Sequence, residues 1–286
     1  MKIWGITRKA GGKVLYFLRC LKWYCYYKRV TFKPRKDNYL KQENWYRKGR
    51  VLLIAPHADD ELLSSYTLLK KCRDITVYYC GFTGSNPSLE NRNARQREIE
   101  QLCKTMDIHV INGYGNCENL VATIKDYNVI VIPSIVDWHP EHRKVSYLLY
   151  NILKETSLKP EIYSYSVTVP NESLEMIWAL PMNKKEQNDK YRIFNKIYHS
   201  QKFMPVYRFR INEKINGFHA QTFAAELFLH HHLEKWLLET YHVMLAEQSE
   251  DPQLNRLIKA VGHTGDMSLV REASREFYQF VAEAKV

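Results

Sequence analysis

The sequence predicts a Rossmann-like α/β fold, with helices on both faces of a mostly parallel sheet. Five short apolar segments alternate with helical segments through the middle of the chain. This alternation is typical of parallel strands joined by crossover helices. Two of the segments, 51–55 and 129–133, are continuous runs rich in Val, Leu and Ile, as expected for strands buried on both faces. A polar cluster follows each of these two runs directly.

The elements of the predicted domain follow from the spacing of apolar residues. Helix 93–106, for example, places Ile99, Leu102 and Met106 on one face. The turn-rich segment 81–91 is either a mobile lid over a site or a plain surface loop. The predicted strands are 51–55, 75–80, 108–111, 129–133 and 161–166, and the helices between them are 61–72, 93–106, 119–127 and 143–156.

The second half of the chain is less regular. Residues 167–181 contain loop and strand material, and 184–203 form a polar helix with an apolar stripe. A long helix is predicted over 220–245, and the last forty residues are charged and helical, with a break at Asp251-Pro252. We therefore predict three parts: an arm (1–50), a Rossmann-like domain (51–230) and a helical C-terminal extension (231–286).

Positive charge is concentrated in the arm. The chain carries a formal charge of +11, but residues 1–50 hold 15 Lys and Arg against 2 acidic residues, while the rest holds 27 against 29. Segment 13–29 also mixes Trp and Tyr with Lys and Arg, the residue types of a membrane interface. One hypothesis is that residues 13–36 bind an anionic membrane surface. The alternative is a helix packed on the domain with solvated charges; a nucleic-acid arm has no supporting motif.

Compartment is indicated by what the sequence lacks. There is no cleavable signal peptide, and the apolar stretch 14–21 is too short to span a bilayer and contains Arg19. The six cysteines form no CxxC pair, which favours free thiols in a reducing environment. We expect a cytoplasmic protein, peripheral at the inner face of the membrane if the arm binds lipid.

The two polar clusters are expected to meet, because the carboxyl ends of parallel strands lie at one edge of the sheet. The first cluster offers His57 and Asp60, and the second offers His139 and His142. Two imidazoles and one carboxylate form the ligand set of a catalytic zinc ion with an open position for water. Asp59 would remain free to take a proton from that water.

At these residues the sequence resembles the LmbE/PIG-L-like zinc-dependent N-deacetylases. Residues 56–61 read PHADDE, similar to the family signature (P/A)HPDDE. Residues 137–142 read DWHPEH, similar to a second signature, HPDH. Two weaker marks agree: RQRE at 95–98 resembles R-x-R-E, and KIYHSQ at 196–201 resembles K-x-x-x-H/Y-S-Q. The resemblance covers about 51–230.

The resemblance implies a role for each matching residue. His57, Asp60 and His142 match zinc ligands, and Asp59 matches the general base. His139 matches a histidine that stabilises the oxyanion or protonates the leaving amine. Glu141 takes the place of the aspartate that orients His139. Ala58 replaces the usual proline of the first signature.

Several other residues have two interpretations. Arg95 and Arg97 either clamp a substrate or form salt bridges on the helix surface with Glu98 or Glu100. Lys196 and His199 would line the cleft. We expect Glu61 to accept a hydrogen bond from the turn rather than to bind metal. The run 230–232, three histidines on the predicted long helix, is not expected to share one ion, and Gly113–Gly115 lacks a phosphate-binding pattern.

The function expected from the sequence is removal of acetate from an N-acetylglucosamine-type conjugate, with zinc as cofactor. "Amino sugar" comes from the resemblance alone. The arm favours a membrane-associated glycan or glycolipid intermediate as substrate. Two alternatives remain open: a metal-dependent hydrolase of a non-sugar amide, and a catalytically silent sugar- or lipid-binding protein on the same fold.

Overall fold

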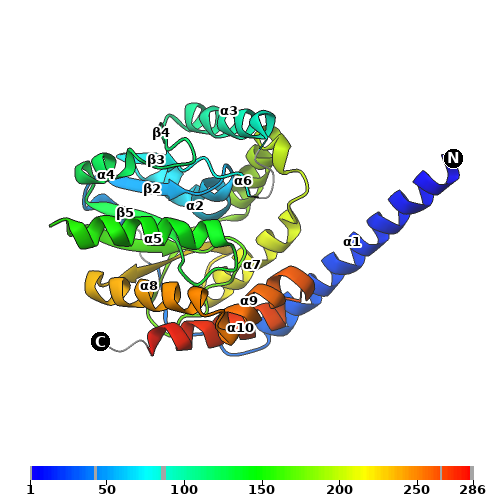
Figure 1. Ribbon diagram of the computed structural model, residues 1–286. Helices are drawn as coiled ribbons and strands as arrows, with labels where there is room; N and C mark the ends of the chain where they lie inside the picture. The colour runs from blue at the N-terminus through cyan, green and yellow to red at the C-terminus, as the bar shows by residue number, and fades with distance from the viewer. Residues whose placement is uncertain (1, 42–43, 85–87, 265, 284–286) are drawn as a thin grey trace.

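A computed structural model describes residues 2–41, 44–84, 88–264 and 266–283 of the chain. Its core is an eight-stranded sheet in the order β1-β7-β8-β6-β5-β2-β3-β4 (Figure 1). All neighbouring strands are parallel except where β8 pairs with β6 and β7. The strands are β1 (Tyr39–Lys41), β2 (Val51–Ala55), β3 (Ile75–Tyr79), β4 (His109–Asn112), β5 (Val129–Pro133), β6 (Glu161–Tyr165), β7 (Ile177–Met182) and β8 (Ala224–His231).

Helices cover both faces of the sheet, as predicted. In β2, the side chains of Leu53 and Ala55 enter one buried apolar cluster, whereas Leu52 and Ile54 enter the other; this alternation follows from the two-residue period of a strand. The first cluster includes α2 (Asp60–Lys71), α3 (Leu89–Met106) and α6 (Lys184–Ile197), and the second includes α4 (Leu120–Thr123), α5 (Pro140–Glu155) and α8 (Leu233–Gln248).

Two predicted boundaries move by a few residues because helices begin earlier than the apolar pattern suggests. Ser88 caps α3 by accepting a hydrogen bond from the Asn91 amide, so the end of the predicted loop 81–91 is helical. His139 caps α5, which places His142 in the first turn of a helix rather than in a loop. The α5 helix therefore holds the second polar cluster rigidly at the sheet edge.

The predicted helix over 220–245 is wrong. Residues 224–231 form β8, a strand buried between β6 and β7, and α8 begins only at Leu233. The sequence AAELFLHH is rich in helix formers, but pairing with two neighbouring strands overrides that local preference. His231 consequently lies in the sheet, where its Nε2 atom contacts the Ser164 hydroxyl at 2.8 Å.

The division into three parts also changes. Trp45 and Tyr46 are buried in the main core and β1 joins the sheet, so the arm proper is α1 (Lys2–Thr31). At the other end, the boundary at 230 falls within β8. The remaining helices are α7 (Val206–His219), α9 (Pro252–Lys259) and α10 (Met267–Ala282); α7 was not predicted.

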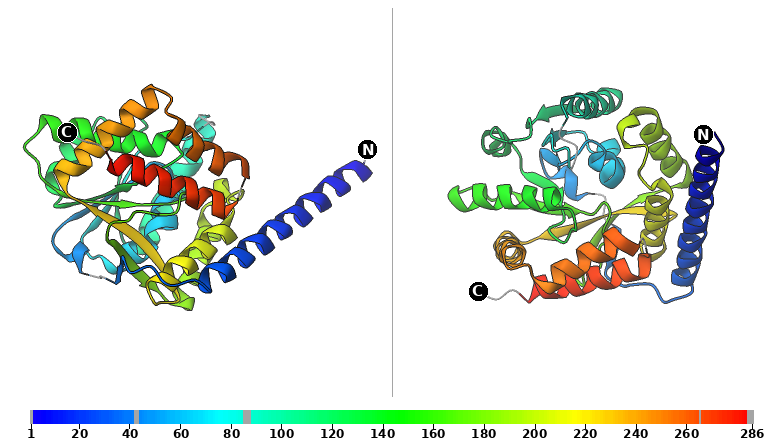
Figure 2. Two further views of the ribbon diagram at one scale, coloured as in Figure 1. Left: turned by 90° about the horizontal axis from the view of Figure 1, so that it is seen from below. Right: turned by 45° about the vertical axis from the view of Figure 1, so that its right-hand side comes forward.

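The arm is partly docked and partly free. Near its C-terminal end, Trp23 is buried against Ile211 and Ile215 of α7, while the N-terminal part of α1 projects away from the body (Figure 1; Figure 2, left). Among the described side chains between residues 14 and 21 of α1, the large apolar side chains of Val14, Phe17, Leu18 and Leu21 are exposed. Among the described helices, none is both long and apolar enough to cross a bilayer.

Candidate metal and catalytic site

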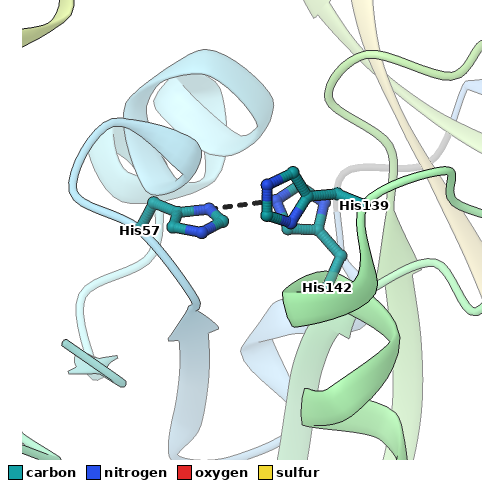
Figure 3. A group of neighbouring side chains, drawn as sticks. All are labelled: His57, His139 and His142. Carbon is teal, nitrogen blue, oxygen red and sulfur yellow. Dashed lines mark hydrogen bonds between the residues drawn. The ribbon is translucent and has the colours of Figure 1, made fainter. Parts of the chain in front are cut away.

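The two polar clusters meet at the carboxyl edge of the sheet, as predicted. Strands β2 and β5 are parallel neighbours, with Val51 beside Val129, so the turns that follow them lie side by side. Figure 3 shows that His57 from the first turn faces His139 and His142 from the second. Ligand atoms of these three histidines lie within 4.8 Å of one another, and the cluster fits a metal site.

Three side chains, His57, Asp60 and His142, form a tighter triangle of possible ligand atoms that does not include His139. The Nδ1 atom of His57 lies 3.1 Å from Oδ2 of Asp60 and 3.2 Å from Nε2 of His142. The third side, from Nε2 of His142 to Oδ2 of Asp60, is 3.3 Å. Metal–ligand bonds of about 2.0–2.1 Å at tetrahedral angles put ligand atoms about 3.3–3.4 Å apart. The donor types and spacing of this triangle therefore fit one small cation.

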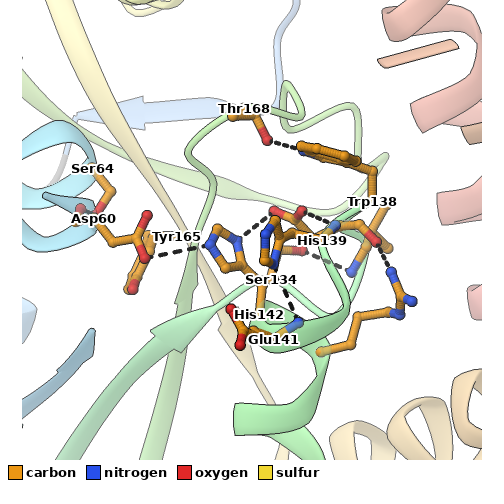
Figure 4. A network of polar contacts seen from close by, with 12 residues as sticks. Asp60, Ser64, Ser134, Trp138, His139, Glu141, His142, Tyr165 and Thr168 are labelled. Carbon is orange, nitrogen blue, oxygen red and sulfur yellow. Dashed lines mark hydrogen bonds and ion pairs between the residues drawn. The ribbon is translucent and has the colours of Figure 1, made fainter. Parts of the chain in front are cut away.

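Each histidine of the triangle is oriented from behind by a carboxylate. Nδ1 of His142 lies 3.0 Å from Asp137, and Nε2 of His57 lies 2.6 Å from Glu141. A proton on these outer nitrogens leaves the inner nitrogens with lone pairs directed at Asp60. Such carboxylate–histidine pairs commonly support metal ligands, and Figure 4 shows the network around His142.

The electrostatics of the triangle favour a positive charge between its members. Burial opposes ionisation of Asp60, but His142 and His57 hold its pKa below the ordinary range. Burial also opposes protonation of His142, yet Asp137 and Asp60 raise its pKa well above the ordinary value. A metal ion would supply the charge that these protons otherwise supply.

Asp59 stands beside the triangle without a partner for one of its oxygens. It is buried and lines the adjoining cavity, and its Oδ2 atom has no hydrogen-bond partner among the described residues. Burial raises the pKa of Asp59 well above its ordinary value, and Asp60 and Glu61 raise it further. Its φ angle of +130° is uncommon for a residue with a side chain, and such backbone strain clusters at functional sites.

Glu61 holds this strained turn, as predicted. Its Oε2 atom accepts a hydrogen bond of 3.1 Å from the Asp59 amide, and its Oε1 atom accepts one from the Tyr198 hydroxyl. Burial raises the pKa of Glu61 to about 7, against the opposing effect of Tyr198. Glu61 therefore orients Asp59 and points away from the triangle.

His139 lies at the mouth of the site in a defined protonation state. Its Nδ1 atom accepts the Glu141 amide at 3.3 Å, so the proton of the neutral ring is on Nε2. Burial, together with the nearby His142 and His57, lowers the pKa of His139 to about 4. A neutral ring with Nε2–H is a hydrogen-bond donor near pH 7.

The role expected for Glu141 needs a correction. The resemblance implies that this carboxylate orients His139, but its Oε2 atom contacts His57 and accepts the Gly84 amide at 2.9 Å. Glu141 lies in the first turn of α5, and its long side chain reaches across to the first cluster. Among the described hydrogen bonds, the one between Glu141 and His139 is made by the backbone N–H of Glu141 and not by its carboxylate.

A cavity of about 610 Å³ opens beside the triangle. It combines polar residues with an apolar wall that includes Trp138, Phe203 and Val261. Arg95 lines it, which favours the interpretation as a substrate clamp over a surface salt bridge. Arg97 and Lys196 are exposed on their helices and do not line it, so their positions favour the surface interpretation. Val261 belongs to the C-terminal extension, which thus contributes to the site.

The two weaker motifs contact each other and shape this cavity. Glu98 accepts hydrogen bonds from the amide and hydroxyl of Ser200, at 2.7 and 2.5 Å. With its side-chain amide turned to satisfy both groups, Gln201 accepts from Arg95 at 3.0–3.1 Å. These contacts of Glu98, and the contact of Asp137 with His142, were not predicted from the sequence. Their positions inside the sequence motifs could have marked them as site residues, but the sequence does not reveal which side chains they contact.

Comparison with known proteins supports the fold. No protein-family model matches the chain, and no curated protein matches it. Among solved structures, an N,N'-diacetylchitobiose deacetylase from Pyrococcus horikoshii, in complex with its inhibitor MPG, matches with a TM-score of 0.53 and 15% sequence identity, covering 66% of this chain and 86% of the other. The zinc-inhibited form of teicoplanin deacetylase Orf2 matches with a TM-score of 0.50 and 12% identity, covering 64% and 98%. The expected α/β fold is confirmed, and it is a fold that these deacetylases share.

Proposed function

We propose that this chain is a zinc-dependent N-deacetylase of the LmbE/PIG-L-like family, acting on an N-acetylglucosamine-type conjugate. The observation that carries the proposal is the triangle of His57, Asp60 and His142, with donor atoms 3.1–3.3 Å apart and the unpartnered carboxylate of Asp59 beside it. The fold shared with two named deacetylases supports it.

The residues of the site fit zinc and a hydrolytic reaction. Two neutral imidazoles and one carboxylate are a common catalytic zinc set. When bound, zinc would polarise the amide carbonyl and activate a water molecule. In this proposal Asp59 accepts the proton of the attacking water and returns it to the departing nitrogen, because it adjoins Asp60 in sequence, lines the cavity and has one oxygen without a partner among the described residues.

His139 is assigned the developing oxyanion. Its neutral ring carries the proton on Nε2, so it donates a hydrogen bond without first losing or gaining a proton. Such preorganised donors commonly contribute about 10²–10³ in kcat. Glu61 and Glu141 act indirectly, the first by holding Asp59 and the second by orienting His57.

The experiment is a zinc determination combined with an acetate-release screen. Purified protein should contain one zinc per chain and release acetate from N-acetylglucosamine conjugates, and a chelator should abolish both. Faster release from non-sugar amides would favour the alternative hydrolase. Zinc-loaded protein that releases no acetate from any substrate would favour a silent binding protein and overturn the proposal.

A membrane-associated substrate is proposed from the projecting part of α1. Val14, Phe17, Leu18 and Leu21 are 49–66% exposed there and recur at helical spacing, so they form one apolar stripe. The stripe lies within the basic arm, and basic residues near an anionic surface contribute about 1 kcal/mol each. The docked part of α1 would keep the catalytic domain close to that surface.

This part of the proposal is tested by liposome cosedimentation. Because Trp23 of the arm is buried against α7, substitution is preferable to deletion of the arm. Phe17→Glu together with Leu21→Glu should abolish pelleting with anionic vesicles. Leu174→Glu, at a site 74% exposed on the body, is the matched control. Equal pelleting of all three proteins would remove the membrane from the proposal.

A further inference from the structure

Arg208 places a buried positive charge without a counter-charge in the wall of the catalytic cavity. It lies in α7, is 7% exposed and lines the cavity beside Asp59 and His142. Its guanidinium donates to the Thr168 carbonyl at 3.3 Å, and its Nε atom has no partner. Among the described residues, no carboxylate forms an ion pair with it.

The other buried Lys and Arg side chains of the described residues each form an ion pair with a glutamate. Arg143 pairs with Glu247, Lys190 with two glutamates, and Arg271 with Glu172. A buried charge is costly unless it is paired. Arg208 is thus the exception, and it is also the one of these four that lines the catalytic cavity.

Two features close to Arg208, the neighbouring Arg271 and the N-terminal end of α7, add positive potential at its position. Burial lowers the pKa of Arg208, and the neighbouring Arg271 lowers it further. The first turn of α7 contains no acidic residue, and its N-cap residue, Pro205, makes no side-chain cap. The N-terminal end of this 14-residue helix carries a partial positive charge from the helix dipole, and Pro205 itself lines the cavity.

We propose that Arg208 binds an oxyanion of the substrate, so that the preferred substrate is an N-acetyl amino sugar bearing a phosphate ester or a carboxylate. The choice of an amino sugar rests on the proposed function, whereas the anion site rests on Arg208 alone. A planar guanidinium pairs with two oxygens of either group at once. The unpaired charge is then neutralised when the substrate enters.

The kinetic test compares neutral and anionic substrates. N-acetylglucosamine, N-acetylglucosamine 1-phosphate and N-acetylmuramic acid would be assayed with wild type, Arg208→Gln and Arg208→Lys. The glutamine variant should lose about 10- to 100-fold in kcat/KM for the better anionic substrate and less than about 3-fold for the neutral sugar, with partial rescue by lysine. Comparable losses for both would overturn the proposal.

A binding measurement separates this proposal from the function itself. Each sugar would be added in thermal unfolding experiments with zinc-loaded protein, with Arg192→Gln, on the surface of α6, as the control. The anionic sugars should raise the Tm of wild type and of the control but not that of Arg208→Gln. Equal shifts with and without Arg208, or no shift in wild type, would overturn the anion site. If binding behaves as expected but no substrate releases acetate, the deacetylase proposal fails and the anion site stands.

Discussion

The Nε2 atom of His57 lies 2.6 Å from the Oε2 atom of Glu141, although the two residues are 84 positions apart in the sequence. This contact joins the two motifs behind the metal triangle. Glu141 also accepts the Gly84 amide, so one carboxylate connects both polar clusters and the loop after β3. The position expected to serve His139 therefore serves the opposite side of the site.

Glu141→Ala should weaken zinc binding rather than act through His139. Without the carboxylate, His57 loses the partner that fixes its tautomer and ring orientation, and losses of such partners typically cost about 10- to 100-fold in metal affinity. Competition with a fluorescent chelator measures the change. Glu155→Ala, exposed at the far end of the same helix, is the control. Unchanged affinity together with a lower kcat would restore the role in orienting His139.

His142→Ala and His139→Ala should differ in metal content. The triangle includes His142, whereas Nδ1 of His139 is occupied by a backbone amide. Elemental analysis should therefore find little zinc in the His142 variant and nearly full zinc in the His139 variant. The His139 variant should still lose about 10²–10³ in kcat, because it lacks the oxyanion donor. Zinc loss in the His139 variant alone would show that His139 is the zinc ligand and that His142 is not.

Asp59→Asn should keep zinc and lose turnover. The amide is nearly the same size as the carboxyl group, but it cannot accept the proton of the attacking water. We expect kcat to fall about 10²- to 10⁴-fold, measured by acetate release with zinc content determined on the same samples. Asp126→Asn, an exposed aspartate, should behave as wild type. An undiminished rate with full zinc would exclude Asp59 as the base.

The parallel half of the sheet was predictable because its strands are local apolar runs. β2 and β5 have the predicted limits, and β3, β4 and β6 differ by a residue at one or both ends. β8 was not predictable in this way. Its Ala, Glu and Leu residues favour helix. The pairing that makes it a strand comes from β6, which is distant in sequence, and from β7, which was indicated only as strand material within 167–181.

The site residues likewise divide into those that the local sequence indicates and those that only the folded chain reveals. His57, Asp60 and His142 could be selected because each sits where a strand ends, and topology then brings the two ends together. The partner of Glu141 could not be derived, because it depends on how far a side chain reaches across the gap between two turns. Arg208 carried no signal at all, since its significance lies in the absence of a nearby carboxylate in the fold.

His219 should make the attachment of the arm sensitive to acid. It is buried at the end of α7, and its Nδ1 atom accepts the Lys36 amide at 3.1 Å, just beyond α1. Burial, together with the charges of Lys36 and Arg271, lowers the pKa of His219 to about 4. Because the unfolded chain takes up this proton near pH 6.5 and the folded chain only near pH 4, stability should fall as pH decreases through this window, by up to about 3 kcal/mol.

The variant His219→Asn tests this dependence. Its side-chain oxygen can replace Nδ1 as the acceptor for Lys36 but does not titrate. In urea unfolding of zinc-free protein between pH 7 and 4, wild type should lose more stability than the variant, whereas the exposed His232→Asn should follow wild type. Comparison at each pH cancels the opposing contributions of His57 and His142, whose raised pKa values favour the folded state in acid. Parallel curves for wild type and His219→Asn would show that this histidine is not the acid-sensitive contact.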